Sequence, residues 1–269
     1  MAKADLFIAI LILWAVVWPH ALDATMIRDQ DHVLSASSEK AIRENILLLN
    51  IGEQQADAAL DRLHLASRYQ VVSVLRDELV SEPVNPSNRN LRAVFALNMI
   101  ELLPELREIS EHTDLWLVFV TVNHLLETAP KGKIDSFVEL YQRRLNSTLS
   151  AASRIALLDG LTQLRIPIKS DLFHSLLGDS HFQVRVAAVE NFVATGNLLS
   201  HEDRIRRMVE AMQMKPYQAR LTAIRSFSML DANERSKLRS RLPANLCASE
   251  SRNDRQSACQ EALNAGGAK

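Results

Sequence analysis

Residues 176–189 read LLGDSHFQVRVAAV and place a turn between two apolar segments. Asp179 and Ser180 are typical helix-start residues, because a short side-chain oxygen accepts hydrogen bonds from the unpaired backbone N–H groups of a first helical turn. A helix is therefore predicted from near His181, and Gly196 ends it because glycine adopts the left-handed conformation of a C-terminal cap. Apolar residues recur along this helix at spacings of three and four and form one stripe: Val184, Ala188, Val189, Phe192 and Val193.

A shorter helix is predicted before the turn, at residues 168–177, so the unit is a pair of helices. The unit contains the pattern L-x-D-x-x-x-x-V-R-x-A-A, and its matching positions include Asp179, Val184, Arg185 and Ala188. This pattern resembles the HEAT repeat, including its PBS-lyase HEAT-like form, and the resemblance is clearest over residues 168–196. It implies an α-solenoid, in which stacked helix pairs bury their apolar stripes against each other. An ordinary amphipathic helix pair in a compact bundle is the alternative.

Composition favours an all-α protein. The 269 residues are 47% hydrophobic and include only 7 glycines and 8 prolines, and no clear period-two segment bounded by turn residues occurs. The strongly apolar helix predicted from Trp116 is expected to be fully buried. Lys and Arg total 31 against 32 for Asp and Glu, so the overall charge offers no electrostatic case for nucleic-acid binding.

The spacing of the predicted second helices indicates a repeat. Their starts fall at Thr113, Thr148, His181 and Pro216, which gives separations of 35, 33 and 35 residues. Periods of this size are typical of stacked helix pairs, since one pair cannot bury its apolar face alone. We therefore expect an all-α fold, an α-solenoid of about five to six degenerate HEAT-like helix pairs over residues 38–230.

The N-terminus is predicted to carry an export or anchoring signal. Residues 6–18 form an unbroken apolar run of thirteen, preceded by Lys3 and followed by a small-residue site at Ala24. A run of about 7–15 apolar residues suits a secretory signal peptide, whereas a membrane span needs roughly 20. Residues 1–24 are thus predicted to be a signal peptide, with an uncleaved anchor over residues 6–22 and a buried helix as alternatives. The first two place the body in the periplasm or elsewhere outside the cytoplasm, with membrane association through the N-terminus in the anchored case.

Residues 231–269 are predicted to be a C-terminal cap and tail. Asp231 starts a short basic helix, whose charges suit the polar outer face of a terminal repeat. Cys247 and Cys259 are the only cysteines, and export would place them where disulfides persist, so a bridge is predicted, with two unrelated thiols as the alternative. Closing this short loop would stabilise the fold by roughly 3 kcal/mol on the chain-entropy model.

The sequence lacks several common catalytic and nucleotide-binding motifs. The eight histidines form no H-E-x-x-H, and neither G-x-S-x-G, G-x-x-x-x-G-K-[ST] nor G-x-G-x-x-G occurs. His124 and Glu127 share one helix face, a spacing more typical of a structural hydrogen bond. The basic run Arg204, Arg206 and Arg207 is interpreted as a solvated face. No catalytic, cofactor-binding or metal-binding residue is therefore predicted.

The leading hypothesis for function is a non-catalytic scaffold or adaptor that binds another protein on the concave face formed by the second helices. The first residues to consider on that face are Arg154, Arg185 and Arg220, with a structural partnership between Arg185 and Asp179 as an alternative. The same repeat pattern also implies, by resemblance, a HEAT-like lyase that attaches or detaches tetrapyrrole pigments, although an export signal counts against it. A third reading is a structural, self-associating envelope component.

Overall fold

The computed structural model describes residues 38–82, 86–213 and 230–242, together with residues 223, 246, 247, 256 and 260. The chain divides into units Met1–Leu34 and Ser35–Lys269, and every described residue lies in the second. The predicted signal or anchor segment, Arg220 and Cys259 lie outside the described residues. Cys247 is buried, and its disulfide with Cys259 stays a prediction. None of the described helices has the length and apolar character needed to cross a membrane.

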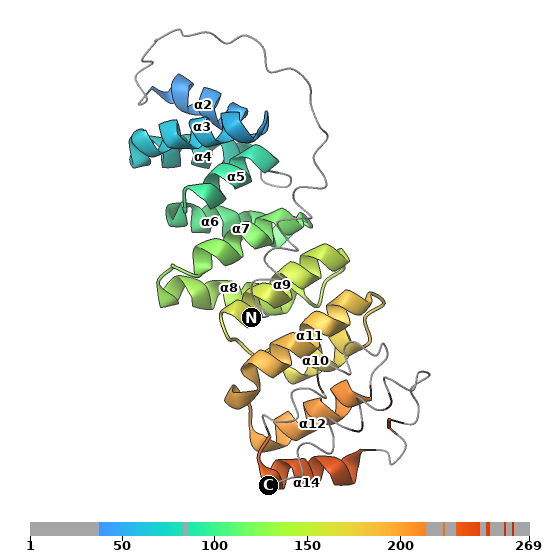
Figure 1. The fold of residues 1–269 in the computed structure, drawn as a ribbon. Coiled ribbons are helices and arrows are strands. Elements are labelled where there is room, and N and C mark those ends of the chain that lie inside the picture. The colour runs from blue at the N-terminus through green and yellow to red at the C-terminus, as the bar shows by residue number, and fades with distance from the viewer. Residues whose placement is uncertain are drawn as a thin grey trace. The chain divides into compact units, whose positions relative to one another are not determined.

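The regular structure of the described part is helical and contains no strand (Figure 1). This confirms the predicted all-α class. The α-helices are α2 (Glu39–Leu48), α3 (Glu53–Leu65), α4 (Arg68–Ser81), α5 (Asn88–Ala96), α6 (Leu103–His112), α7 (Trp116–Leu126), α8 (Lys131–Arg144), α9 (Ala151–Gln163), α10 (Ser170–Leu177), α11 (Phe182–Thr195), α12 (His201–Met212) and α14 (Ala232–Arg241). Two short 3-10 helices, η1 (Ile100–Leu102) and η2 (Gly196–Leu198), extend α6 and α11.

Local capping explains where several helices begin. Ser38 accepts a hydrogen bond from Ala41 N at the start of α2, and Ser150 accepts one from Ser153 N at the start of α9. Asp231 begins α14 with a complete capping box. These side chains satisfy backbone donors that a helix leaves unpaired at its first turn.

Successive helices pack as pairs, and the pairs contact their neighbours through like helices. The second helices α5, α7, α9 and α11 contact each other in that order, and the first helices form the runs α4–α6–α8 and α10–α12–α14. Three hydrogen bonds between successive pairs join residues 33 positions apart: Arg68 to Glu101, Lys133 to Ile100 and Asn123 to Ala156. Other hydrogen bonds between successive pairs join residues 25 positions apart, as between Arg154 and Asp179, or 39 positions apart, as between Ser153 and Asp114.

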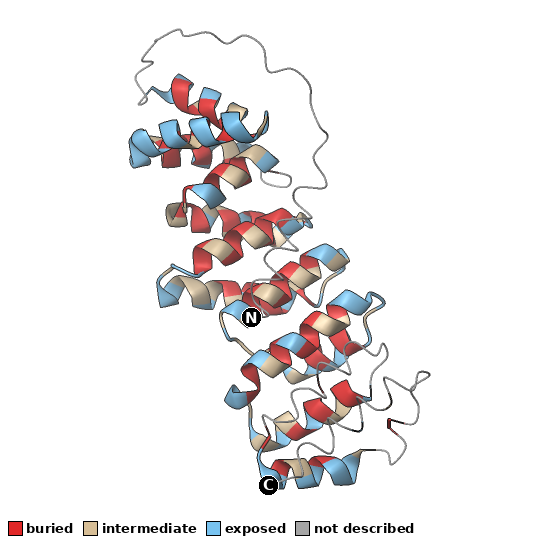
Figure 2. Cartoon of the chain, viewed as in Figure 1, coloured by how far each residue is buried: buried red, intermediate tan, exposed pale blue. Residues whose placement is uncertain are grey.

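The core lies between the two helices of each pair and between successive pairs (Figure 2). Tyr141 is fully buried, and its ring packs edge-on against Phe119 and Phe137 at centroid distances of 6.3 and 6.2 Å. Phe173 and Phe192 join α10 to α11 at 5.6 Å between ring centroids. These aromatic side chains are among the largest fully buried side chains of the described part.

Several predictions about individual residues were wrong. Val120, predicted to be buried with the rest of its helix, is half-buried, and Gly196 ends α11 at φ −58° instead of in the left-handed conformation. Trp116 is 37% exposed, because it lies at the first position of α7 on the side that faces solvent. Arg207 is 3% exposed instead of solvated. Its guanidinium lies 5.1 Å from the centre of the Phe173 ring and donates to the Ile168 carbonyl at 2.7 Å, and burial lowers its pKa.

Candidate functional site

The candidate site is the solvent-facing side of α5, α7, α9 and α11, which we call the second-helix face. Between α7 and α9, Ser153 Oγ donates to the Asp114 carbonyl at 2.8 Å, and Asn123 Nδ2 donates to the Ala156 carbonyl at 2.7 Å. The first contact lies near the N-terminal ends of both helices, and the second lies further toward their C-terminal ends. The two helices are therefore parallel, so equivalent turns lie beside each other.

The same register continues from α9 to α11. Arg154 Nε lies 3.0 Å from Asp179 Oδ2 near the starts of these helices, and Asn191 Nδ2 donates to Thr162 Oγ1 at 3.2 Å near their ends. Asn191 also accepts a hydrogen bond from the Ile168 backbone at 3.2 Å. Side chains at equivalent turns of α7, α9 and α11 therefore form bands that cross the three helices.

The first turns of these helices present an apolar band. Trp116 is 37% exposed and Phe182 is 45% exposed, and three further apolar side chains of the band are half-buried. These are Val120, Ile155 and Val186. Single exposed apolar residues are common in proteins, so what distinguishes this band is the helix register, which brings two large aromatic residues and three half-buried apolar residues to the first turns of adjacent helices.

The next turn presents ionisable groups. Phe95 of α5 stacks on His124 of α7 with ring centroids 4.1 Å apart. Asp159 and Glu190, which we call the carboxylate pair, occupy the corresponding turns of α9 and α11. Within the described part of the chain, neither carboxylate makes a hydrogen bond or an ion pair. Burial and the charge of Glu190 raise the pKa of Asp159 to about 6, and desolvation raises the pKa of Glu190 although its side chain reaches solvent.

Replacing Asp159 with asparagine is expected to raise the free energy of unfolding by about 1–2 kcal/mol at pH 7.5. The folded state holds the Asp159 proton up to about pH 6, whereas an unfolded aspartate loses it near pH 4. The wild-type protein therefore loses stability as the pH rises through this window, and the variant does not. Urea unfolding at pH 4 and pH 7.5 measures the difference, which should be several-fold smaller at the lower pH. Asp57→Asn, at an exposed carboxylate of α3, is the control and should have little effect.

Two of the predicted binding arginines, Arg154 and Arg185, lie at the contact between two helix pairs. Arg154 Nη2 donates to Asp179 Oδ1 at 3.2 Å, in addition to its ion pair, and Arg154 Nη1 donates to the Leu149 carbonyl. Arg185 Nη1 donates to the Asp179 carbonyl. Both guanidinium groups thus contact the turn that contains Asp179. Their contact with a partner stays a prediction, as does that of Arg220, which lies outside the described residues.

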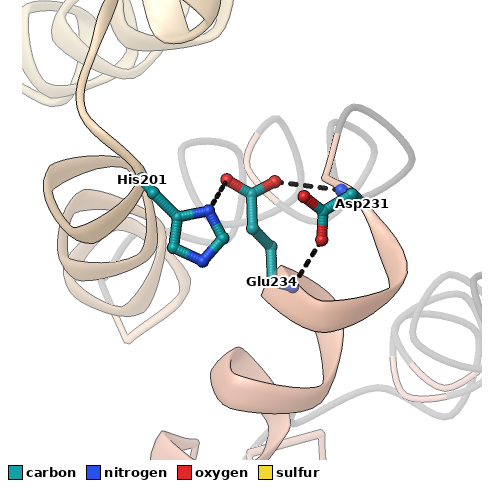
Figure 3. Close-up of side chains that lie close together, drawn as sticks. All are labelled: His201, Asp231 and Glu234. Atoms are coloured by element: carbon teal, nitrogen blue, oxygen red, sulfur yellow. Dashed lines mark hydrogen bonds and ion pairs between the residues drawn. The ribbon is translucent and has the colours of Figure 1, made fainter.

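A second cluster joins α12 to α14 (Figure 3). Glu234 is 1% exposed, and its Oε1 lies 2.9 Å from His201 Nδ1 and 3.3 Å from Arg204 Nε. Its Oε2 accepts a hydrogen bond from Asp231 N at 2.9 Å, and Asp231 Oδ1 accepts one from Glu234 N at 2.7 Å. Potential metal ligands from His201, Asp231 and Glu234 lie within 4.8 Å of one another. The Arg204 cation and the capping box already occupy Glu234, so the cluster suits a structural link between helices better than a metal site.

Sequence reasoning missed the carboxylate pair and the exposed apolar band. Asp159 lies one turn after Ile155 on a mostly apolar helix, and this isolated carboxylate is the signal that could have marked it. No protein-family model matches the chain, and no curated protein matches it in sequence. The resemblance to HEAT repeats therefore rests on the sequence pattern within residues 168–196.

Proposed function

We propose that the chain is a HEAT-like α-solenoid, exported or tethered to a membrane through its N-terminus, that acts as a scaffold by binding another protein on the second-helix face. The observation that carries this proposal is the exposed apolar band across three parallel helices, with Trp116 and Phe182 at its ends. Aromatic residues at the centre of an interface commonly supply most of its binding energy. Their exposure would otherwise be unfavourable to the isolated protein.

The succession of contacts between like helices supports the solenoid part of the proposal. In such an array each helix pair contacts only the pairs on either side of it. The second-helix face therefore stays exposed to solvent along the stack. Asn123, Asn191 and the ion pair between Arg154 and Asp179 would hold successive pairs in register. A rigid row of helices of this kind provides a surface for an extended partner.

Site-specific photo-crosslinking in cells that make the protein tests this function. A benzophenone amino acid replaces Ala152 of α9 or Gln183 of α11, both of which are exposed on the second-helix face. Matched controls carry it at Glu139 of α8 or Ser175 of α10, which are exposed on first helices. We expect adducts of one mass at both face positions and at neither control. Equal adducts at all four positions, or none, would contradict the proposal, and an adduct of twice the chain mass would identify self-association instead.

A further inference from the structure

We infer that the partner of the second-helix face is an amphipathic protein segment with basic side chains, and that Asp159 and Glu190 receive its Lys or Arg residues. This inference rests on the proposed function and specifies the chemistry of the partner. Two observations carry it: the carboxylate pair has no internal partner within the described part of the chain, and it lies one helical turn from the apolar band. A ligand that satisfies both must be apolar on one side and cationic beside it.

The missing partner is unusual at Asp159, because the other half-buried or buried carboxylates of the described part form ion pairs. Glu190 is exposed, and exposed carboxylates of the described part such as Asp57 and Asp135 also lack a partner. Glu101 and Glu111 form ion pairs with Arg68 and Arg143 across successive helix pairs, although the Glu101 side chain is 40% exposed and solvent could satisfy it. Asp179 is likewise paired with Arg154. Asp159 is among the less exposed carboxylates, where an unpaired charge is least favourable, yet it lies beside a second carboxylate. A charge that is partly withdrawn from water is stabilised by a partner, so a cation supplied from outside would complete the arrangement at Asp159.

The surrounding groups do not supply that cation. Arg154 on α9 donates to Asp179 Oδ1, and Arg185 on α11 donates to the Asp179 carbonyl. On the solvent-facing side of α7, His124 is stacked on Phe95, and the next ionisable side chain is Glu127, another carboxylate. Asp159 therefore lies beside a second carboxylate, while the arginines at the starts of α9 and α11 contact the turn that contains Asp179.

The geometry also specifies the pattern of the ligand. The residues Ile155 and Asp159 are one turn apart on α9, as are Val186 and Glu190 on α11, which corresponds to about 6 Å along each helix axis. An amphipathic helix with apolar residues beside lysines or arginines spaced by three or four positions presents both groups at matching distances. An anionic or purely apolar segment would leave the carboxylates unpaired and desolvated, which opposes binding.

The test uses the purified full chain and a synthetic 18-residue amphipathic peptide of leucine and lysine that carries a fluorophore. Fluorescence anisotropy at about 0.1 M salt measures its affinity for the wild type, the Asp159→Asn/Glu190→Gln double variant and the Asp57→Asn/Asp61→Asn double variant. The last is a matched control, because it removes the same charge from two exposed carboxylates of α3. The same peptide with glutamate in place of lysine controls for apolar binding.

We expect the lysine peptide to bind the wild type and to lose about tenfold or more in affinity for the Asp159/Glu190 variant. The Asp57/Asp61 variant should change by less than about twofold, since exposed charges contribute little. The glutamate peptide should not bind. Equal losses in both double variants, or no loss in either, would overturn the inference. Crosslinked adducts that form equally well with the Asp159/Glu190 variant would also overturn it while leaving the proposed function intact. The absence of adducts despite pair-dependent peptide binding would instead contradict the proposed function.

Discussion

Replacement of Gly160 with alanine is expected to lower the free energy of unfolding by about 2–3 kcal/mol. Gly160 lies in α9 where this helix packs closely on α7, and an alanine Cβ would lie 2.1 Å from Asn123 Oδ1 and 2.7 Å from Tyr141 Cε2. The Asn123 side chain cannot rotate away without loss, because it donates to the Ala156 carbonyl and accepts from the Tyr141 hydroxyl, both at 2.7 Å. Both polar groups are buried, so breaking either hydrogen bond leaves an unsatisfied atom in the core.

Urea unfolding followed by circular dichroism measures this effect. Gly132→Ala is the matched control, because Gly132 is also in a helix but a Cβ there meets no atom within 4 Å. Alanine favours helix over glycine, so the control should be neutral or stabilising by up to about 1 kcal/mol. A Gly160→Ala protein as stable as the wild type would show that α7 and α9 can separate without loss. The separation between the helix pairs would then not be set by this contact.

The structural features that could be predicted from the sequence are those that depend on residues close together in the chain. The helix start at Asp231 was predicted correctly, because a cap joins a side chain to a backbone group three residues away. The all-α class followed in the same way from apolar spacing and from the scarcity of glycine and proline. These interactions form within one helix, so the local sequence contains the information they require.

The candidate site could not be predicted in this way, because it depends on the register between helices. Asp159 and Glu190 are 31 residues apart in the chain and become neighbours only because α9 and α11 are parallel. An amphipathic pattern likewise gives the apolar side of a helix but does not show whether a terminal residue such as Trp116 is covered by another helix. The burial of Arg207 could not be predicted for the same reason, since the Phe173 ring that its guanidinium contacts belongs to another helix, α10.

Replacement of Asp179 with alanine is expected to lower the free energy of unfolding by about 1–3 kcal/mol, because it leaves the Arg154 guanidinium largely buried without its carboxylate. The two side chains are only 12% and 15% exposed, so water compensates little for the lost ion pair. The backbone N–H of His181 also loses its acceptor, Asp179 Oδ1, at 2.8 Å. Asp135→Ala, at an exposed carboxylate of α8, should change stability by less than about 0.5 kcal/mol under the same conditions.

A double-mutant cycle that combines Asp179→Ala with Arg154→Ala distinguishes two roles of Arg154, a structural contact between helix pairs and a contact with the partner protein. If Arg154 holds successive helix pairs together, the single variants are both destabilised and their effects are not additive, with a coupling free energy of about 1–2 kcal/mol. Crosslinking from Ala152 should then be unchanged wherever the Arg154 variant is folded. If Arg154 instead binds the partner, its removal should abolish the crosslink without destabilising the chain. The contacts of Arg154 with both Asp179 and the Leu149 carbonyl favour the first result, because a guanidinium already engaged on two sides has few donors left for a partner.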